Sequence, residues 1–171
     1  MIITKSVTDI QKKLETYATK EKKEILPRFF KTGKGEYGEG DKFLGVVVPN
    51  IRQVAKRNVD VNDITLNGLL TSCWHEMRMC GLLILCTRFE KADEKTRSYI
   101  YHYYLSHTAA INNWDLVDLS APCIMGRYLL DKKEERKELY NLATSNILWE
   151  QRIAVVSTLT FIRKDDFNDI L

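Results

Sequence analysis

Three tryptophans recur along this chain at a spacing that is typical of a repeated helical unit. Trp74, Trp114 and Trp149 are 40 and then 35 residues apart, and each lies at or near the start of an apolar, helix-like run. Only three prolines and eight glycines occur in 171 residues, so long stretches are free to be helical. The spacing therefore predicts a two-helix unit that is used repeatedly.

A short internal match supports this repeat. Residues 76–80 (Glu-Met-Arg-Met-Cys) resemble residues 150–154 (Glu-Gln-Arg-Ile-Ala) at an offset of 74, which is two steps of 37. One step from Arg78 falls on Asp115, so the middle unit carries an acidic residue where the others carry a basic one. A period near 40 with two helices per step is typical of HEAT-like solenoids. We therefore expect one domain over residues 1–171, with an all-α fold that forms a curved α-α superhelix of HEAT-like repeats.

The positions of individual helices follow from apolar periodicity and from capping residues. We expect helices over residues 6–25, 49–57, 63–72, 74–89, 93–106, 113–130, 134–145 and 149–163. Ser6 or Thr8 can cap the first of these, and its charged run 20–24 is interpreted as a solvated helix end. Residues 31–45 hold five of the eight glycines and predict a loop. Pro122 is expected to kink or divide the helix over 113–130.

Composition excludes several classes of function. The net charge of +3 is small and does not by itself indicate a nucleic acid partner. Without C-x-x-C spacing among the four cysteines, and with only three histidines, we expect no zinc site. Cys80 and Cys86 lie in an apolar run and are expected to be buried thiols of a reduced, intracellular protein. Neither a signal peptide nor a membrane span of roughly 20 apolar residues is apparent, so we expect a cytoplasmic location.

The segment over residues 113–118 (Asn-Trp-Asp-Leu-Val-Asp) contains the groups best suited to chemistry. Asn112 or Asn113 can cap a helix, on which Trp114 and Asp118 share a face because they are four residues apart. Cleavage of a glycosidic bond builds positive charge on the sugar, and a fixed carboxylate stabilises that charge. The indole face of Trp114 favours cationic or C–H groups.

One unit later, Arg152 offers a guanidinium fork that is suited to a phosphate. If equivalent helices line one concave surface, Arg152 meets Trp114 and Asp118 there. A structural interpretation stays open on the pattern alone. In that interpretation Asp115 and Asp118 are cap and surface charges, Trp114 packs in the core, and Arg152 is the partner of an acidic side chain.

Other basic residues are candidates for contacts with phosphates. Lys34, together with Lys31 and Lys42, lies in the glycine-rich loop, although acidic residues keep the net charge of this loop near zero. The loop lacks the Gly-Lys-Ser/Thr ending of a nucleoside triphosphate site. Arg52 and Lys56 share one helix face, which either follows a DNA backbone or is simply solvated. Arg78 is in phase with Arg152, and either joins the same surface or pairs with the helix neighbours of Glu76.

These motifs together resemble the AlkD-type DNA alkylation repair family, the HEAT-like DNA glycosylases. The resemblance covers nearly the whole chain. It is carried by residues 29–33 (Phe-Phe-Lys-Thr-Gly), 35–41 (Gly-Glu-Tyr-Gly-Glu-Gly-Asp), 43–46 (Phe-Leu-Gly-Val), 48–49 (Val-Pro), 113–118 and 149–154. The two later motifs, in this order and at this separation, are specific to the family.

The resemblance implies a base excision repair enzyme that removes N3- or N7-alkylated, cationic purines from double-stranded DNA. By similarity, Asp118 stabilises the oxocarbenium-like sugar and positions water, Trp114 lies against the deoxyribose, and Arg152 holds a backbone phosphate. Tyr37 matches the family and either contacts DNA or pins the loop. The leaving base is already charged and needs little acid catalysis, and it is not placed in a deep pocket. No metal or organic cofactor is implied, and we expect a monomer.

The sequence departs from the family pattern at its C-terminal side. The family continues into a further repeat with a second tryptophan, whereas this sequence has none after Trp149. Residues 165–171 are expected to lie inside the next helix, so we expect the last C-terminal repeat to be missing. Two rival functions follow, namely a non-catalytic DNA-binding relative and a protein-interaction scaffold, which is the usual role of HEAT arrays.

Overall fold

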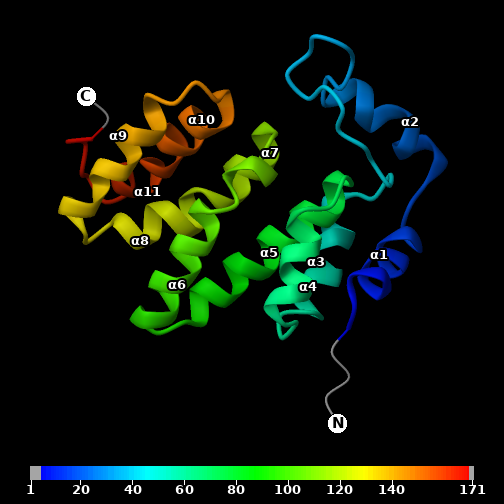
Figure 1. Cartoon of the computed structure of the whole chain (residues 1–171), viewed down its shortest axis with the longest axis horizontal. Helices are drawn as coiled ribbons and strands as arrows, with labels where there is room; N and C mark the ends of the chain where they lie inside the picture. The colour runs from blue at the N-terminus through cyan, green and yellow to red at the C-terminus, as the bar shows by residue number, and fades with distance from the viewer. Residues whose placement is uncertain (1–4, 170–171) are drawn as a thin grey trace. The chain divides into compact units, whose positions relative to one another are not determined.

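The computed structural model describes residues 5–169, which form helices joined by turns and, between α2 and α3, by a long loop (Figure 1). In chain order the α-helices are α1 (Val7–Glu15), α2 (Lys20–Phe29), α3 (Val48–Lys56), α4 (Asp63–Leu70), α5 (His75–Lys91), α6 (Glu94–Leu105), α7 (Trp114–Ser120), α8 (Arg127–Leu129), α9 (Lys137–Ala143), α10 (Leu148–Ser157) and α11 (Leu159–Ile162). Three shorter turns are η1 (Thr108–Ala110), η2 (Pro122–Gly126) and η3 (Lys133–Arg136). Within residues 5–169 the only β-type pairing is an isolated bridge between Lys42 and Trp74. The all-α prediction is confirmed.

The chain forms two compact units, with the boundary between Thr87 and Arg88, inside α5. Each unit has its own core. Over residues 5–169, no helix is long and apolar enough to cross a bilayer. The HEAT-like superhelix concerns the arrangement of the whole chain, and it stays a prediction.

The first unit is built around the N-terminal part of α5, whose residues 75–86 are all buried. A helix that is buried on every side belongs at the centre of a core, and these residues are apolar or glycine apart from His75, Glu76 and Arg78. The packing at Gly81 is close, because a Cβ there would lie 2.9 Å from Leu70 Cδ2 of α4 and the leucine side chain would have to shift. Helix α1 contributes the buried Ile10 and Leu14 and packs against α3 and α4.

The helix expected over residues 6–25 is in fact two helices. Ser6 caps α1 through a capping box with Asp9, as expected. The chain then turns, and Thr19 caps α2 by accepting a hydrogen bond from the Lys22 N–H at 3.2 Å. The charged run 20–24 therefore forms the first turns of α2 and is not the end of the first helix.

The glycine-rich segment 31–45 is a loop, which confirms the prediction. Its turns require left-handed backbone at several positions, among them Gly45 with φ +92°. The Gly45 carbonyl accepts a hydrogen bond from the Thr19 N–H at 3.0 Å. A Cβ at Gly45 would lie only 2.8 Å from the Thr19 carbonyl oxygen and the Lys23 nitrogen. The loop is thus packed directly against the start of α2.

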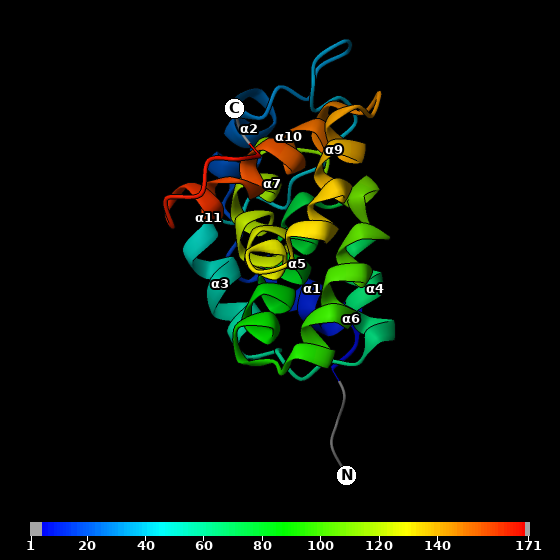
Figure 2. The ribbon, with the colours of Figure 1, turned by 90° about the vertical axis from the view of Figure 1, so that its left-hand side faces the viewer.

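The second unit packs around α10, which contacts α9, α7 and η2 (Figures 1 and 2). The helix expected over 113–130 is divided at Pro122, as the sequence predicts. Residues 122–126 form a π-helical turn, in which the Gly126 N–H donates to the Ala121 carbonyl at 2.9 Å. A proline has no N–H to continue the α-helical ladder, so the chain re-forms its hydrogen bonds with a wider turn.

A buried arginine closes the C-terminal part of this unit. The Arg136 side chain is 3% exposed and lies over the Phe161 ring, with its guanidinium carbon 4.0 Å from the ring centroid. It donates to the Leu129 carbonyl and to the carboxylates of Asp166 and Asp169. A buried guanidinium is tolerated because it has these partners.

The expected helix over residues 165–171 is not formed in its described part. Residues 165–169 are turns and irregular backbone, and the left-handed φ of +56° at Asp165 does not allow the α-helix to continue through it. Asp166 and Asp169 are directed to Arg136 instead. Residues 170 and 171 lie outside the described residues.

The ion pair between Arg136 and Asp166 predicts an acid-dependent stability. The hydrogen bond from Arg136 lowers the pKa of Asp166 below its ordinary value of 3.8. A lowered folded-state pKa contributes stability above the unfolded-state pKa of about 3.9, and this contribution is lost as the pH falls through the folded value. We therefore expect Asp166→Asn to be less stable than the parent at neutral pH, and the difference to shrink below about pH 4.

Urea unfolding from neutral pH to about pH 2 measures this difference in the free energy of unfolding. Asp165→Asn is the control, because it removes the neighbouring exposed carboxylate and keeps a residue that tolerates left-handed backbone. A difference between parent and Asp166→Asn that stays constant over the whole pH range would contradict the assignment.

Candidate functional site

The second unit brings together Asp118 of α7 and Arg152 of α10. Arg152 Nε donates to Asp118 Oδ1 at 2.9 Å, and one terminal nitrogen donates to Oδ2 at 2.8 Å. This is a two-pronged contact, the strongest geometry for an arginine and a carboxylate. The two side chains are 39% and 40% exposed, so solvent and a ligand can reach both.

Local sequence explains where Asp118 points. Asn113 is fully buried and begins α7 by accepting the Trp114 N–H on Oδ1 at 2.9 Å. Leu116 and Val117 then turn to the core, which leaves Asp118 on the outer face of the helix. Trp114 is partly buried and lies one helical turn before Asp118. The Asn113 cap predicted from the sequence is confirmed.

Arg152 comes from the second turn of α10. Ile153, Ala154 and Ser157 bury the inner face of that helix, and Arg152 lies on the side that meets α7. The hydrogen bonds that Arg152 donates to Asp118 raise the pKa of Arg152 above its ordinary value, outweighing the opposite effect of its partial burial. The guanidinium is therefore a permanent cation, and Asp118 is its partner. The sequence left open whether Arg152 pairs with an acidic side chain, and in the free protein it does.

The pair allows two chemical functions. A guanidinium fork binds phosphate oxygens with the same geometry that it uses for a carboxylate. An aspartate carboxylate stabilises a neighbouring positive charge and orients water. In the closed pair each group neutralises the charge of the other, while both side chains remain partly exposed.

The other candidates lie in the first unit, and two are on the tip of the glycine-rich loop. Lys34 is exposed, and Tyr37 is 43% exposed. The acidic residues of the loop serve its own backbone, because Glu36 accepts the Gly33 N–H and Glu39 accepts the Gly35 N–H, each at 2.8 Å. The loop tip thus presents a cation and a phenol ring, while the carboxylates of Glu36 and Glu39 bind N–H groups of the loop backbone.

Arg52 and Lys56 are both exposed on the outer face of α3. Ile51, Val54 and Ala55 bury the opposite face. The four-residue spacing places the two cations one turn apart, as the sequence predicts. They form a small basic strip on the first unit.

Arg78 is not on the surface. It is 5% exposed, and it donates to the Asp41 carboxylate and, at 2.9 Å, to the Ser72 carbonyl. His75 Nδ1 lies 2.9 Å from the other oxygen of Asp41. Burial alone would raise the pKa of Asp41, but the hydrogen bond from His75 and the charge of Arg78 outweigh it and lower that pKa. In the free protein Arg78 is therefore buried and paired, and its expected DNA contact stays a prediction.

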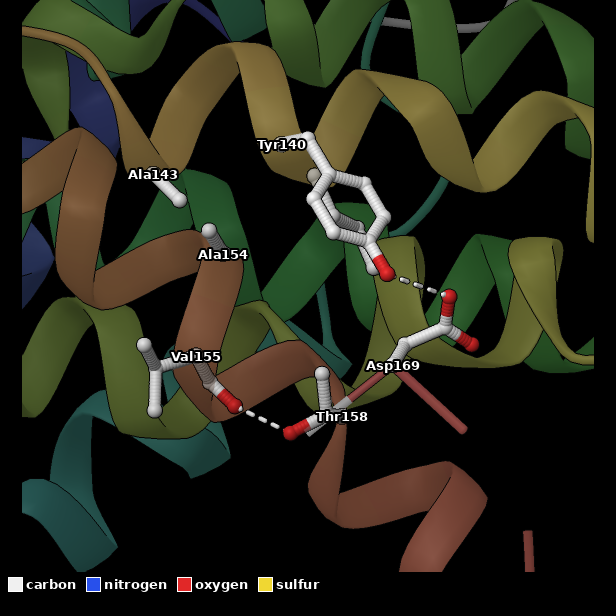
Figure 3. Close-up of a pocket in the computed structure, with 7 residues that line it drawn as sticks. Tyr140, Ala143, Ala154, Val155, Thr158 and Asp169 are labelled. Carbon is white, nitrogen blue, oxygen red and sulfur yellow. Dashed lines mark hydrogen bonds between the residues drawn. The ribbon is translucent and has the colours of Figure 1, made fainter. Parts of the chain in front are cut away.

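A separate hollow of about 250 Å³ opens between α9 and α10 (Figure 3). Its walls are mostly apolar, with Ala143 and Ala154 among them. Its polar groups already bond to one another or to the backbone. The Tyr140 hydroxyl donates to Asp169 at 3.1 Å, and Thr158 Oγ1 donates to the Val155 carbonyl at 2.6 Å. We assign this hollow no part in the chemistry.

Sequence reasoning missed the roles of three acidic residues. Asp41 was read only as a loop charge, although it is the buried partner of Arg78. Glu76 and Glu150 begin the two matching segments, and each lies two residues before an arginine. The repeated Glu-x-Arg pattern is the sequence feature from which structural roles for Glu76 and Glu150 could have been predicted.

Comparison with known proteins agrees with the motifs. A family model described as "DNA alkylation repair enzyme" matches residues 10–171, which include every candidate residue named above. A comparison with curated proteins finds no match. The family expected from the sequence is confirmed.

Proposed function

The chain belongs to the DNA alkylation repair enzyme family, and we propose that it is a DNA glycosylase acting on N3- or N7-alkylated purines in double-stranded DNA. The reaction is hydrolysis of the N-glycosidic bond. The observation that carries this proposal is the exposed contact of Asp118 with Arg152, one helical turn from Trp114.

The chemistry follows from the charge of the damaged base. When the bond between the sugar C1′ and the purine nitrogen breaks, both electrons go to the cationic base, which leaves as a neutral molecule. The sugar becomes an oxocarbenium-like cation, and the Asp118 carboxylate stabilises it and orients a water molecule. The water oxygen bonds to C1′ and a proton is released, so the products are the free alkylated base and an abasic site.

Arg152 and Trp114 hold the nucleotide in this proposal. Arg152 binds a backbone phosphate, and the indole of Trp114 lies against the deoxyribose. The free protein pairs Arg152 with Asp118, so the phosphate takes the place of the carboxylate on the guanidinium. This exchange leaves Asp118 with an uncompensated negative charge at the moment when the sugar needs it.

The loop tip and the basic strip of the first unit are proposed to contact DNA and to take no part in the chemistry. Lys34, Arg52 and Lys56 supply positive charge for phosphates, and Tyr37 supplies an exposed ring for a sugar or a groove edge. Such contacts contribute affinity that does not depend on sequence. The protein is proposed to act as a monomer inside the cell, where its substrate is.

The direct test is release of free base from methylated duplex DNA. We expect the purified chain to liberate N7-methylguanine or N3-methyladenine and to leave abasic sites in equal number. Salt-dependent DNA binding without base release would favour the non-catalytic relative. Weak binding with little salt dependence would favour the protein-interaction scaffold.

A second expectation concerns phosphate binding by Arg152. We expect Arg152→Ala to weaken DNA binding and to reduce by about one the slope of log affinity against log salt. Base release should fall as well, because the nucleotide is no longer held. Fluorescence anisotropy with labelled duplex at several salt concentrations measures both quantities.

The matched control for this variant is Arg127→Ala. Arg127 also forms an exposed ion pair, with Glu90 at 3.2 Å, in the same unit. Equal salt slopes for the parent and Arg152→Ala would remove Arg152 from the proposed phosphate site.

A further inference from the structure

The Glu150 carboxylate links the segment before α7, the helix that carries Asp118, to the start of α10, the helix that carries Arg152. Glu150 lies in the first turn of α10, and its Oε1 accepts a hydrogen bond from Thr108 Oγ1 at 2.8 Å. Its other oxygen accepts a hydrogen bond from Ser145 Oγ. Thr108 begins η1, six residues before Trp114. The contact therefore spans 42 residues and ties the segment that leads into α7 to the start of α10.

Glu150 acts on Asp118 only through the placement of its helix. Residues two apart on an α-helix do not face each other, so Glu150 and Arg152 point to different sides of α10. Arg152 reaches α7, while Glu150 reaches Thr108. Glu150 can therefore fix the position of α10 although its side chain points away from the candidate site.

The N-cap residue of α10, Ile147, makes no side-chain capping hydrogen bond, so Ser145 and Glu150 supply side-chain contacts at the start of this helix. Ser145 Oγ accepts the Ile147 N–H at 3.1 Å and donates to Glu150. The Glu150 carboxylate also places negative charge at the positive end of the helix. Thr108, Ser145 and Glu150 thus fix where the first turn of α10 begins.

The first unit has the same arrangement in a buried form. Glu76 lies two residues before Arg78 and accepts the N–H groups of residues 44, 45 and 46 at 2.8, 2.8 and 3.0 Å. That segment follows Asp41, the partner of Arg78. In each unit, the glutamate two residues before the arginine holds a segment that is linked to the aspartate of the pair.

We propose that Glu150 and Thr108 are positioning residues that set the spacing between α7 and α10 at which Asp118 meets Arg152. This inference rests on the proposed function in one respect, since it makes that spacing matter for base release. A displacement of about 1 Å in a catalytic arrangement can lower a rate by as much as about 10²-fold.

The test replaces the hydroxyl of Thr108 without changing its shape. Thr108→Val removes the donor to Glu150, and Thr108→Ser keeps it. In the free protein, we expect the Nε–H NMR signal of Arg152 to move in Thr108→Val toward its position in Asp118→Asn. In Thr108→Ser the signal should stay at its parental position.

Activity provides the second readout. We expect Thr108→Val to lower the single-turnover rate of base release by about 10-fold while DNA affinity is unchanged, because spacing affects the transition state more than binding. Thr108→Ser should restore the parental rate. Adding Glu150→Ala to Thr108→Val should lower the rate less than the product of the two single effects, since both remove one contact.

Glu138→Ala is the matched control, because it removes a carboxylate that accepts a hydrogen bond from Asn141 at 3.0 Å on the neighbouring helix α9. A parental Arg152 signal in Thr108→Val overturns the inference, and so does a rate loss that Thr108→Ser does not restore. If the parent chain releases no base, the proposed function fails, and the NMR signal alone decides whether Thr108 sets the spacing.

Discussion

Asp118→Asn is expected to lower the single-turnover rate of base release by at least about 10²-fold, the usual cost of removing one preorganised electrostatic group from a transition state. Asparagine keeps the size of the side chain but has no negative charge to stabilise the sugar cation. DNA affinity should be unchanged or slightly higher. Arg152 loses its charged competitor in the free protein and is then more available to a phosphate.

Two measurements on the same duplex separate these effects, namely single-turnover release of N7-methylguanine and equilibrium binding of undamaged DNA. Asp115→Asn is the matched control, because it makes the same change of charge one turn earlier in α7. Equal release rates for the parent and Asp118→Asn would exclude Asp118 from the mechanism. A large loss of DNA affinity in this variant would contradict the proposed exchange of partners on Arg152.

Glu76→Ala is expected to give the largest loss of stability among the changes considered. The carboxylate is 1% exposed and accepts three backbone N–H groups of residues 44–46. Without it, these buried donors have no acceptor, and each unsatisfied donor costs about 1–3 kcal/mol. The free energy of unfolding should therefore fall by about 3 kcal/mol or more.

Urea unfolding monitored by circular dichroism measures this loss. Glu39→Ala is the matched control, because its carboxylate accepts one exposed loop N–H, that of Gly35. We expect the control to change stability by less than about 0.5 kcal/mol, as is usual for surface substitutions. A loss in Glu76→Ala as small as that of the control would show that the loop anchor contributes little.

The helices were predictable where apolar periodicity and local breakers agree. Pro122 divides its helix as expected, since the missing N–H acts at the proline itself. The turn before Thr19 was missed because apolar residues at helical spacing suggested one continuous helix. The Thr19 cap is a local signal, but the contact of Thr19 with Gly45 that fixes it comes from a distant segment.

The candidate site shows more clearly what the position of a residue within a repeat cannot predict. Arg78 and Arg152 occupy equivalent positions in matching segments, and each pairs with an aspartate. One pair is buried and the other is about 40% exposed. The difference depends on which segments of the chain pack around each arginine, although the two arginines are related by an offset of 74 residues. Apolar periodicity predicts on which face of its helix a residue lies. Whether that residue is buried depends on the segments from elsewhere in the chain that pack against this face.

The closed contact between Asp118 and Arg152 has a consequence for molecules that are not DNA. An alkylated nucleoside is as cationic as the lesion in a polymer, but it brings no phosphodiester to compete for the guanidinium. It therefore meets a carboxylate that is already neutralised, and the proposed enzyme leaves it intact. Free alkylated nucleosides and released bases in the cell would then not compete for the site, and the repair activity would act only on lesions within a DNA strand.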